Sequence, residues 1–210
     1  MSILKQINDT FRPESGYKAF FLSMITFGLG YGLYKGIIDN YLAEVVGMSG
    51  FDKGVTEFFR ELPGLLLVFL LAALYMFSAE KIYKIGAIIM VAGLTMQTVI
   101  PADRVLVTAA IFIYSLGEHM QLGMKNTLSL QYSREGHGGV ALGLQNSVHQ
   151  IGMLAGYIAV ILIFWILKTL GIETLFILSA VLGLCNSAYA ATIKPTKKGN
   201  IHDNPKLRSR

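Results

Sequence analysis

Apolar residues along this chain are gathered into six long runs, which are separated by short polar connections. About 20 mostly apolar residues suffice for a helix to cross a bilayer, so each run is long enough for one span. Short connections predict that sequential helices pack as antiparallel neighbours. The expected spans are residues 17–38, 55–79, 85–102, 105–132, 139–167 and 174–193.

The composition agrees with a membrane protein. Hydrophobic residues make up 53% of the chain and charged residues 15%, with a mean hydropathy of +0.54, whereas soluble domains carry about 25% charged residues. The net charge of +5 does not indicate nucleic-acid binding, because the basic residues lie at the edges of the apolar runs, as membrane topology requires. We therefore predict an all-α integral membrane protein.

Basic residues set the expected orientation. If six spans alternate in direction, twelve lysines and arginines fall on the side of the two chain ends, and only Lys53, Arg104 and Lys168 fall on the other. The positive-inside rule then puts both ends in the cytoplasm of a multi-pass protein of the plasma (inner) membrane. We expect an N-tail at 1–16, a bundle at 17–193 and a basic, disordered C-tail at 194–210.

A weak internal repeat relates the two halves of the chain. At an offset of 87 residues, Leu29-Gly30 falls on Leu116-Gly117, and at an offset of 85, Gly54-Val55 falls on Gly139-Val140. Two near-constant offsets suggest a 3+3 duplication, and three helices per copy require inverted topology, which is typical of secondary transporters. Glycine pairs are common in membrane helices, so coincidence is the alternative.

Polar and charged residues recur inside the expected spans, where an ionisable group costs about 2.5–3.5 kcal/mol on insertion scales. In the fourth span, Glu118, Gln121, Lys125 and Ser129 fall within about 80° of arc at 100° per residue. Such residues either hold helices together through polar contacts or line a polar cavity. Three charges at similar depth on two spans, Glu118, Lys125 and Lys35, favour the cavity. Its expected lining is Tyr31, Tyr34, Lys35, Glu118, His119, Gln121, Lys125, Asn126, Gln145, Asn146 and His149.

Each charged residue of the cavity has an expected role. Lys35 and Lys125 would attract an anionic or polar solute, and Glu118 would carry a proton or balance charge. His119 and His149 are able to titrate near neutral pH, although a membrane histidine is more often a packing residue. Lys35 and Asp39 are spaced i, i+4 and can pair.

A second charged cluster opens the expected second span. Glu57 and Arg60 are spaced i, i+3 and can pair, and Pro63 removes a backbone donor and should loosen the helix. The cluster is either an outer gate or an interfacial anchor with a proline in an early turn. The residues of the proposed outer gate are Asp39, Glu57, Arg60 and Glu61.

Motifs of enzymes and cofactor sites are missing from the sequence. We find no phosphate-binding glycine loop, no metal-ligand spacing and no nucleophile elbow. Cys185 is the only cysteine, which excludes a cysteine metal cluster. We therefore expect no enzymatic activity, no cofactor and no metal.

One stretch of the sequence resembles the N-terminal six-helix half of the major facilitator superfamily of secondary transporters. It comprises Gly30 to Gly36 (GYGLYKG), Asp39 to Leu42 (DNYL) and Glu57 to Gly64 (EFFRELPG). The resemblance implies a transport path between two six-helix halves. The loop from Ser78 to Gly86 departs from the family's usual signature, because only Glu80 and Lys81 stand for its acid–base pair.

Members of this superfamily usually have twelve spans in one chain, and six spans cannot enclose a path alone, because the polar stripe would face lipid. We therefore predict a homodimer or a separate C-terminal-half polypeptide as partner; an inactive remnant is the third possibility. The expected function is secondary active transport of a small polar or anionic solute by alternating access, with or without coupling to protons. The alternative is a non-transporting membrane subunit that scaffolds or regulates a partner.

Overall fold

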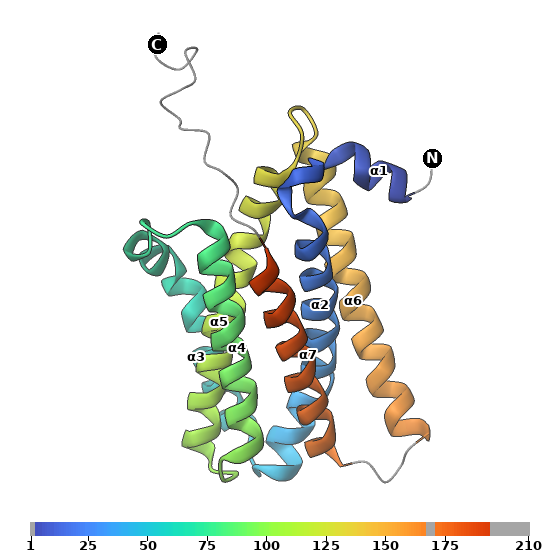
Figure 1. The fold of residues 1–210 in the computed structure, drawn as a ribbon. Coiled ribbons are helices and arrows are strands. Elements are labelled where there is room, and N and C mark those ends of the chain that lie inside the picture. The colour runs from blue at the N-terminus through green and yellow to red at the C-terminus, as the bar shows by residue number, and fades with distance from the viewer. Residues whose placement is uncertain (1–2, 167–170, 194–210) are drawn as a thin grey trace.

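The computed structural model describes residues 3–166 and 171–193, and within these ranges the chain is all-helical apart from short turns and one isolated β-bridge (Figure 1). The long helices run up and down a single bundle. The elements are α1 (Ile3–Thr10), the 3-10 helix η1 (Pro13–Ser15), α2 (Tyr17–Asn40), which continues into the π-helical turn η2 (Tyr41–Val45), α3 (Gly50–Ala73), α4 (Ala79–Val99), α5 (Arg104–Tyr132), α6 (Gly138–Ile166) and α7 (Ile172–Thr192).

Four of these helices are long and apolar enough to cross a membrane. They are the combined helix Tyr17–Val45, α4, α5 and α6. Helix α3 carries three charged residues in its middle, and the described apolar part of α7, Phe176–Thr192, is shorter. The expected all-α fold is confirmed, and the helices are compatible with a multi-pass membrane protein.

Helix α3 differs from its expected span at both ends. It begins at Gly50, because Ser49 and Asp52 form a capping box in which Asp52 N donates to Ser49 Oγ (3.2 Å) and Ser49 N donates to Asp52 Oδ2 (2.9 Å). Helix α3 ends at Ala73, and Ser78 then caps α4. The expectation of one helix across 55–79 is therefore wrong, since apolar residues 74–77 form the turn between the two helices.

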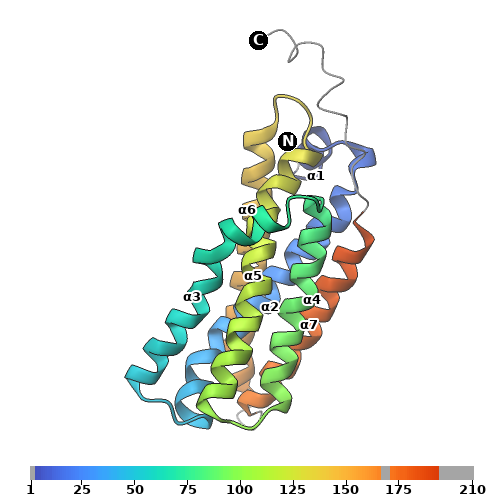
Figure 2. The ribbon, with the colours of Figure 1, turned by 90° about the vertical axis from the view of Figure 1, so that its left-hand side faces the viewer.

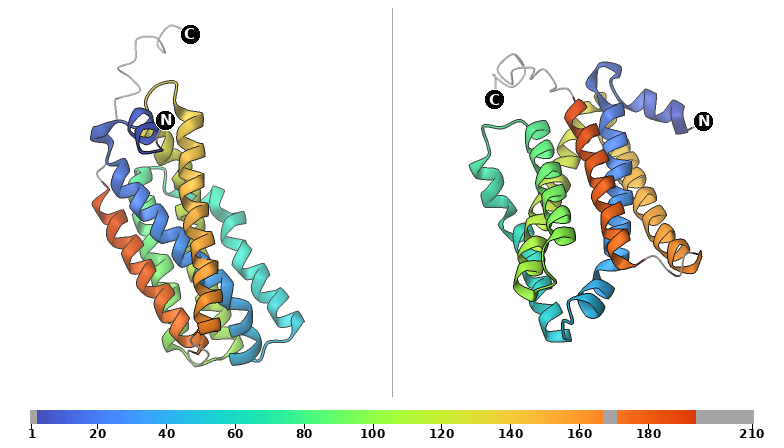
Figure 3. Two further views of the ribbon diagram at one scale, coloured as in Figure 1. Left: turned by 90° about the vertical axis from the view of Figure 1, so that its right-hand side faces the viewer. Right: turned by 60° about the horizontal axis from the view of Figure 1, so that its bottom comes forward.

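The bundle places α2 between α6 and α7, α4 against α5 and α7, and α3 beside α5 (Figures 2 and 3). Small residues allow the closest approaches. A Cβ added at Gly32 of α2 would lie 2.9 Å from the carbonyl carbon of Met153 on α6. Likewise, a Cβ added at Gly93 of α4 would lie 2.8 Å from the Cβ of Tyr114 on α5.

The two ends of the bundle carry different basic residues. Helix α1 and the end of α7 lie at the same end (Figure 1), where Lys84 Nζ donates to the carbonyl of Ala191 (3.1 Å). At the opposite end, Arg104 donates to the carbonyl of Gly47 (3.1 Å). The expected cytoplasmic C-tail at 194–210 lies outside the described residues.

The N-terminal segment packs on the bundle. Phe11 is fully buried and stacks on Tyr17 at 5.4 Å between ring centroids. Arg12 N donates to the Tyr132 carbonyl (3.0 Å), and Arg134 N donates to the Thr10 carbonyl (2.9 Å). Residues 3–15, which we expected to be part of a tail, therefore join the start of α2 to the turn after α5.

Candidate functional site

A charged cluster on α3 forms the first part of the candidate site. Arg60, only 9% exposed, pairs with Glu57 one turn earlier and with Glu61 at 2.5 Å. The i, i+3 spacing brings the first pair together. The Arg60 carbonyl also accepts a hydrogen bond from Ser115 Oγ on α5, so the cluster is joined to the neighbouring helix. The expected Glu57–Arg60 pair is confirmed.

The cluster lies deeper in the bundle than the sequence suggested. Since α3 begins at Gly50, the charges from Glu57 to Glu61 are about 10–17 Å along the helix at 1.5 Å per residue. Asp39 is exposed at the end of α2 and makes no ion pair with any described residue. Three of the four expected gate residues therefore lie together, and Asp39 does not join them.

Glu118 is the most deeply buried acid near this cluster. Its side chain is 2% exposed, and Oε2 has no hydrogen-bond partner among the described residues. Arg60 and Lys35 are the cations that attract its carboxylate. The nearby Tyr34 and Tyr114 rings lie 4.2 Å apart, and the Tyr114 hydroxyl also lacks a partner in the described structure. Buried polar atoms without partners are rare, and they indicate water, a ligand or a missing contact.

His119 faces α3 and not the region around Glu118. Its Nε2 lies 3.8 Å from Glu61 Oε2, and its Nδ1 lies 2.9 Å from the Ser115 carbonyl. The ring is accommodated because residue 64 is glycine: a Cβ there would lie 2.6 Å from two ring atoms. His119 therefore extends the Arg60 cluster across the α3–α5 contact.

A second polar group lies between α2, α5 and α6. Lys125 Nζ donates to Asn146 Oδ1 (3.3 Å), and the His149 ring lies 5.1 Å from Phe27 and 6.3 Å from Tyr31. Gln145 Oε1 and His149 Nε2 are buried without hydrogen-bond partners among the residues described. Residue Asn126 is exposed. Two neighbouring helices thus present amides, an imidazole and an ammonium group in one region.

Gln121 lies in the interior of the bundle, where its Nε2 atom has no hydrogen-bond partner among the described residues. Its Oε1 accepts from Asn186 Nδ2 (2.8 Å), and Asn186 Oδ1 accepts from Ser23 Oγ (2.6 Å). Ser23 also shares a hydrogen bond with the Tyr83 hydroxyl (2.8 Å). This chain of hydrogen bonds ties together α5, α7, α2 and α4. Sequence reasoning missed Ser23, Tyr83 and Asn186, because each is a single polar residue within an apolar run.

Tyr34 likewise belongs to the interior. It is fully buried, and its hydroxyl donates to Gln97 Oε1 on α4 (3.3 Å). The remaining expected residue of α2, Lys35, is half-buried and forms no ion pair with Asp39. The structure thus divides the predicted set into interior residues, represented by Gln121 and Tyr34, and residues toward α3 and α6.

Comparison with known proteins adds no family. No family model matches the chain, and no curated protein matches it. Within the described ranges, no group of three or more histidine, cysteine, aspartate or glutamate side chains is arranged to hold a metal ion. The geometry of the polar residues is therefore the basis for inferring a function.

Proposed function

We propose that this chain forms one six-helix half of a secondary transporter of the major facilitator type, which moves a small polar or anionic solute by alternating access. The observation that carries the proposal is the buried Glu118 carboxylate, whose Oε2 lacks a hydrogen bond within the described part of the chain while Arg60 and Lys35 attract it. A charge in such a position requires water, a solute or a proton to compensate it.

The lengths of the helices support a 3+3 repeat. The combined helix Tyr17–Val45 and α5 each contain 29 residues, and the second begins 87 residues after the first. Helices α4 and α7 each contain 21 residues and are offset by 93. The middle helices differ more, since α3 has 24 residues and α6 has 29.

The neighbours of the helices support the same repeat. If α2, α3 and α4 correspond to α5, α6 and α7, then the contact of α2 with α6 matches that of α5 with α3. The contact of α2 with α7 matches that of α5 with α4, and α4 contacts α7. Because α2 and α5 run in opposite directions (Figure 1), the two copies are inverted, as in secondary transporters.

Glycine contacts give a residue-level match. Gly30 of α2 packs against Ser179 and Gly183 of α7, and Gly117 of α5 packs against Gly86 and Met90 of α4. The two glycines are 87 residues apart, and Ser179 and Gly183 each come 93 residues after Gly86 and Met90; the nearest contact of Gly30, Leu182, has no counterpart among the contacts of Gly117. These contacts support an offset of 93 between the third and sixth spans, α4 and α7.

The proposal assigns roles to the residues around Glu118. Lys35 and Lys125 attract the solute, and Glu118 exchanges a proton as the solute moves. Arg60, held by Glu57 and Glu61, supports the α3 side of the path. The polar groups shared by α2, α3, α5 and α6 would be costly against lipid. A second six-helix unit, either another copy or a separate polypeptide, therefore covers them.

Water access to this face tests the proposal. In a Cys185→Ser background, which removes the exposed native thiol, cysteine replaces Asn146 or Tyr31 on the polar face, or Ile151, an exposed apolar residue of α6. A membrane-impermeant maleimide applied to membrane vesicles should label Asn146→Cys and Tyr31→Cys but not Ile151→Cys. Labelling only after detergent extraction would contradict a water-filled path.

The second candidate function is a non-transporting membrane subunit. The observation in its favour is that Gln145 and His149 are both buried, yet each retains an atom without a hydrogen bond to the residues that the structure describes. A bound protein segment can supply the missing partners. In this case the polar face contacts protein throughout. The same labelling experiment then shows protection at Asn146→Cys that is lost when the partner is removed.

A further inference from the structure

A groove between α3 and α5 lies apart from the polar site. It has a volume of about 840 Å³ and is lined by residues of the first half of each helix. Relative to Glu118 on α5, the apolar lining residues Val105, Ala109 and Phe112 lie about 120–180° around the helix axis at 100° per residue. Relative to Glu57 on α3, Val55 and Phe59 are similarly displaced. The groove therefore opens on the opposite face of both helices.

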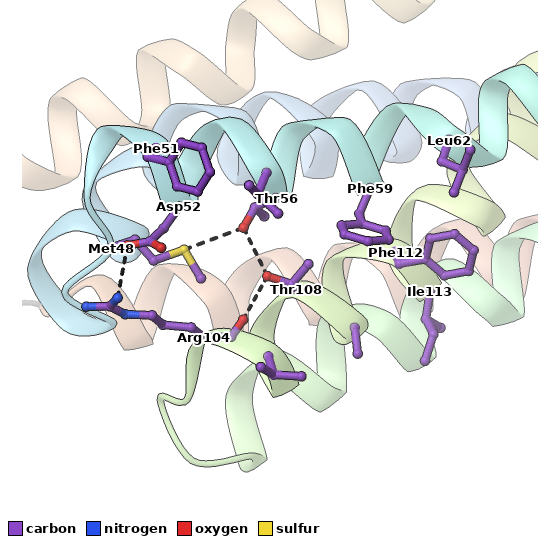
Figure 4. A pocket seen from close by; sticks show the side chains of 13 residues that line it. Met48, Phe51, Asp52, Thr56, Phe59, Leu62, Arg104, Thr108, Phe112 and Ile113 are labelled. Carbon is purple, nitrogen blue, oxygen red and sulfur yellow. Dashed lines mark hydrogen bonds and ion pairs between the residues drawn. The ribbon is translucent and has the colours of Figure 1, made fainter.

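The floor of the groove offers nothing to a polar ligand. The polar pair in the floor is Thr56 with Thr108, and these hydroxyls lie 2.9 Å apart and satisfy each other (Figure 4). The Thr108 hydroxyl also reaches the Arg104 carbonyl (2.7 Å). Phe59 and Phe112 lie together on one side of the pair, toward Leu62 and Ile113. A ligand between the helices must therefore be apolar.

One end of the groove is charged. Arg104 pairs with Asp52 (3.0 Å), donates to the Gly47 carbonyl (3.1 Å) and keeps 58% of its side chain exposed. Asp103, the neighbouring acid, is engaged as the N-cap of α5, where it accepts from Val105 N and Leu106 N. A guanidinium that is positioned and still accessible is a suitable partner for a phosphate.

The length of the groove matches one leaflet of a bilayer. From the charged end to Leu62 on α3 and Ile113 on α5, it extends nine to ten residues, or about 15 Å at 1.5 Å per residue. The hydrocarbon core of a bilayer is about 30 Å thick, so one leaflet occupies about half of that distance. The groove thus offers a charged end at the membrane surface and an apolar channel toward the midplane.

We propose that this groove binds a membrane phospholipid, with an acyl chain between α3 and α5 and the phosphate at Arg104. Small residues leave the space for the chain, since Ala109 is exposed between the two walls. The site is independent of the solute path, so it does not require the proposed transport activity.

Native mass spectrometry of the full chain in mild detergent tests the site, with palmitoyl-oleoyl phosphatidylglycerol as the added lipid. We expect one lipid per chain to bind more tightly than the rest. Ala109→Trp, which fills the groove, should weaken that binding at least tenfold. Arg104→Gln should weaken it severalfold. Leu154→Trp, on the exposed face of α6, should leave it unchanged.

Equal lipid binding by Ala109→Trp and Leu154→Trp would overturn the proposal. Because a groove variant can fail to fold, the unmodified chain supplies a second test. Phosphatidylglycerol with a diazirine in its acyl chain should cross-link to the peptides containing Phe112 and Phe59 in preference to the exposed peptides of α6. Uniform labelling of all lipid-facing helices would also contradict the site.

Discussion

The guanidinium of Arg60 forms its ion pairs with Glu57 and Glu61 on its own helix, and the Oε2 atom of Glu118 on the adjacent helix α5 has no hydrogen bond to any described residue. Arg60 thus pairs with two half-exposed carboxylates, while the buried Glu118 carboxylate nearby lacks a full set of partners among the described residues. This imbalance distinguishes the region from an ordinary helix contact, in which buried polar groups are paired.

Removal of the Arg60 charge should have a modest effect on stability. Glu57 and Glu61 are 57% and 56% exposed, so we expect Arg60→Gln to lower the free energy of unfolding by about 1 kcal/mol. Arg60→Lys should recover part of this loss, because lysine keeps the charge but lacks the planar fork. Thermal unfolding in detergent measures both variants. If Arg60→Lys lowered the free energy of unfolding more than Arg60→Gln does, the result would contradict the pairing.

Removal of Glu118 should affect transport more than folding. In membrane vesicles with an imposed pH gradient, we expect Glu118→Gln to abolish the proton flux that small organic anions elicit from the unmodified chain. The matched control is Glu44→Gln, at an exposed acid hydrogen-bonded to Asn40, which should retain the flux. Equal flux in Glu118→Gln and the unmodified chain would remove Glu118 from the mechanism.

The close contact of α2 with α6 depends on Gly32. A Cβ there would lie 2.9 Å from the carbonyl carbon of Met153 and 3.1 Å from the Cα of Gly156. We expect Gly32→Ala to destabilise the bundle by about 1–3 kcal/mol, as overpacking does. Gly54→Ala, with open space around it, should instead stabilise α3 by about 0.5–1 kcal/mol. The midpoint of unfolding in detergent measures both effects. The same change in this midpoint for Gly32→Ala and Gly54→Ala would be inconsistent with this packing.

The hydrogen-bond chain through Asn186 should stabilise the bundle. Asn186→Ala removes the partner of the buried Gln121 Oε1 and one of the two partners of Ser23, and we expect a loss of about 1–3 kcal/mol. Ser187→Ala is the control, because the Ser187 hydroxyl makes no hydrogen bond in the described structure. Chemical unfolding in mixed micelles compares the two, and similar losses would argue against the network.

Asp52, which lies before the expected span 55–79, should make the stability of the start of α3 depend on pH. The hydrogen bonds from the Ser49 hydroxyl and backbone, and then the charge of Arg104, hold the Asp52 pKa below its usual 3.8. A depressed pKa stabilises the folded cap above pH 3.8, and the stabilisation is lost as the pH falls through the lower folded value. Amide exchange at residues 50–53 should rise in that window, and Asp52→Asn should remove the pH dependence.

Much of the fold follows from the apolar runs. All six expected spans contain a helix of the structure, and the ends of the fourth, 105–132, agree with α5 (Arg104–Tyr132) to one residue. Hydrophobicity did not locate the ends of α3, because a capping box at Ser49 and a turn of apolar residues set them. Local hydrogen bonds outweighed composition at both points.

The candidate site was predicted less completely than the fold. Helical spacing places Gln121 near Glu118, but α5 is packed on several sides, and Gln121 meets Asn186 in the interior. Which of two adjacent polar residues faces the core depends on the neighbouring helix. The partner of Arg60 was predictable, since Glu57 lies one turn away, whereas the contact of His119 with Glu61 required the register of α3 on α5.

The central claim is that a second six-helix unit covers the polar groups that α2, α3, α5 and α6 present around Glu118. Mass spectrometry of protein released directly from native membranes, without prior detergent, measures the assembly. The account predicts a complex of two 23.0 kDa chains or of one chain with one separate membrane partner. A solitary chain, with no second polypeptide in the released particles, would contradict it.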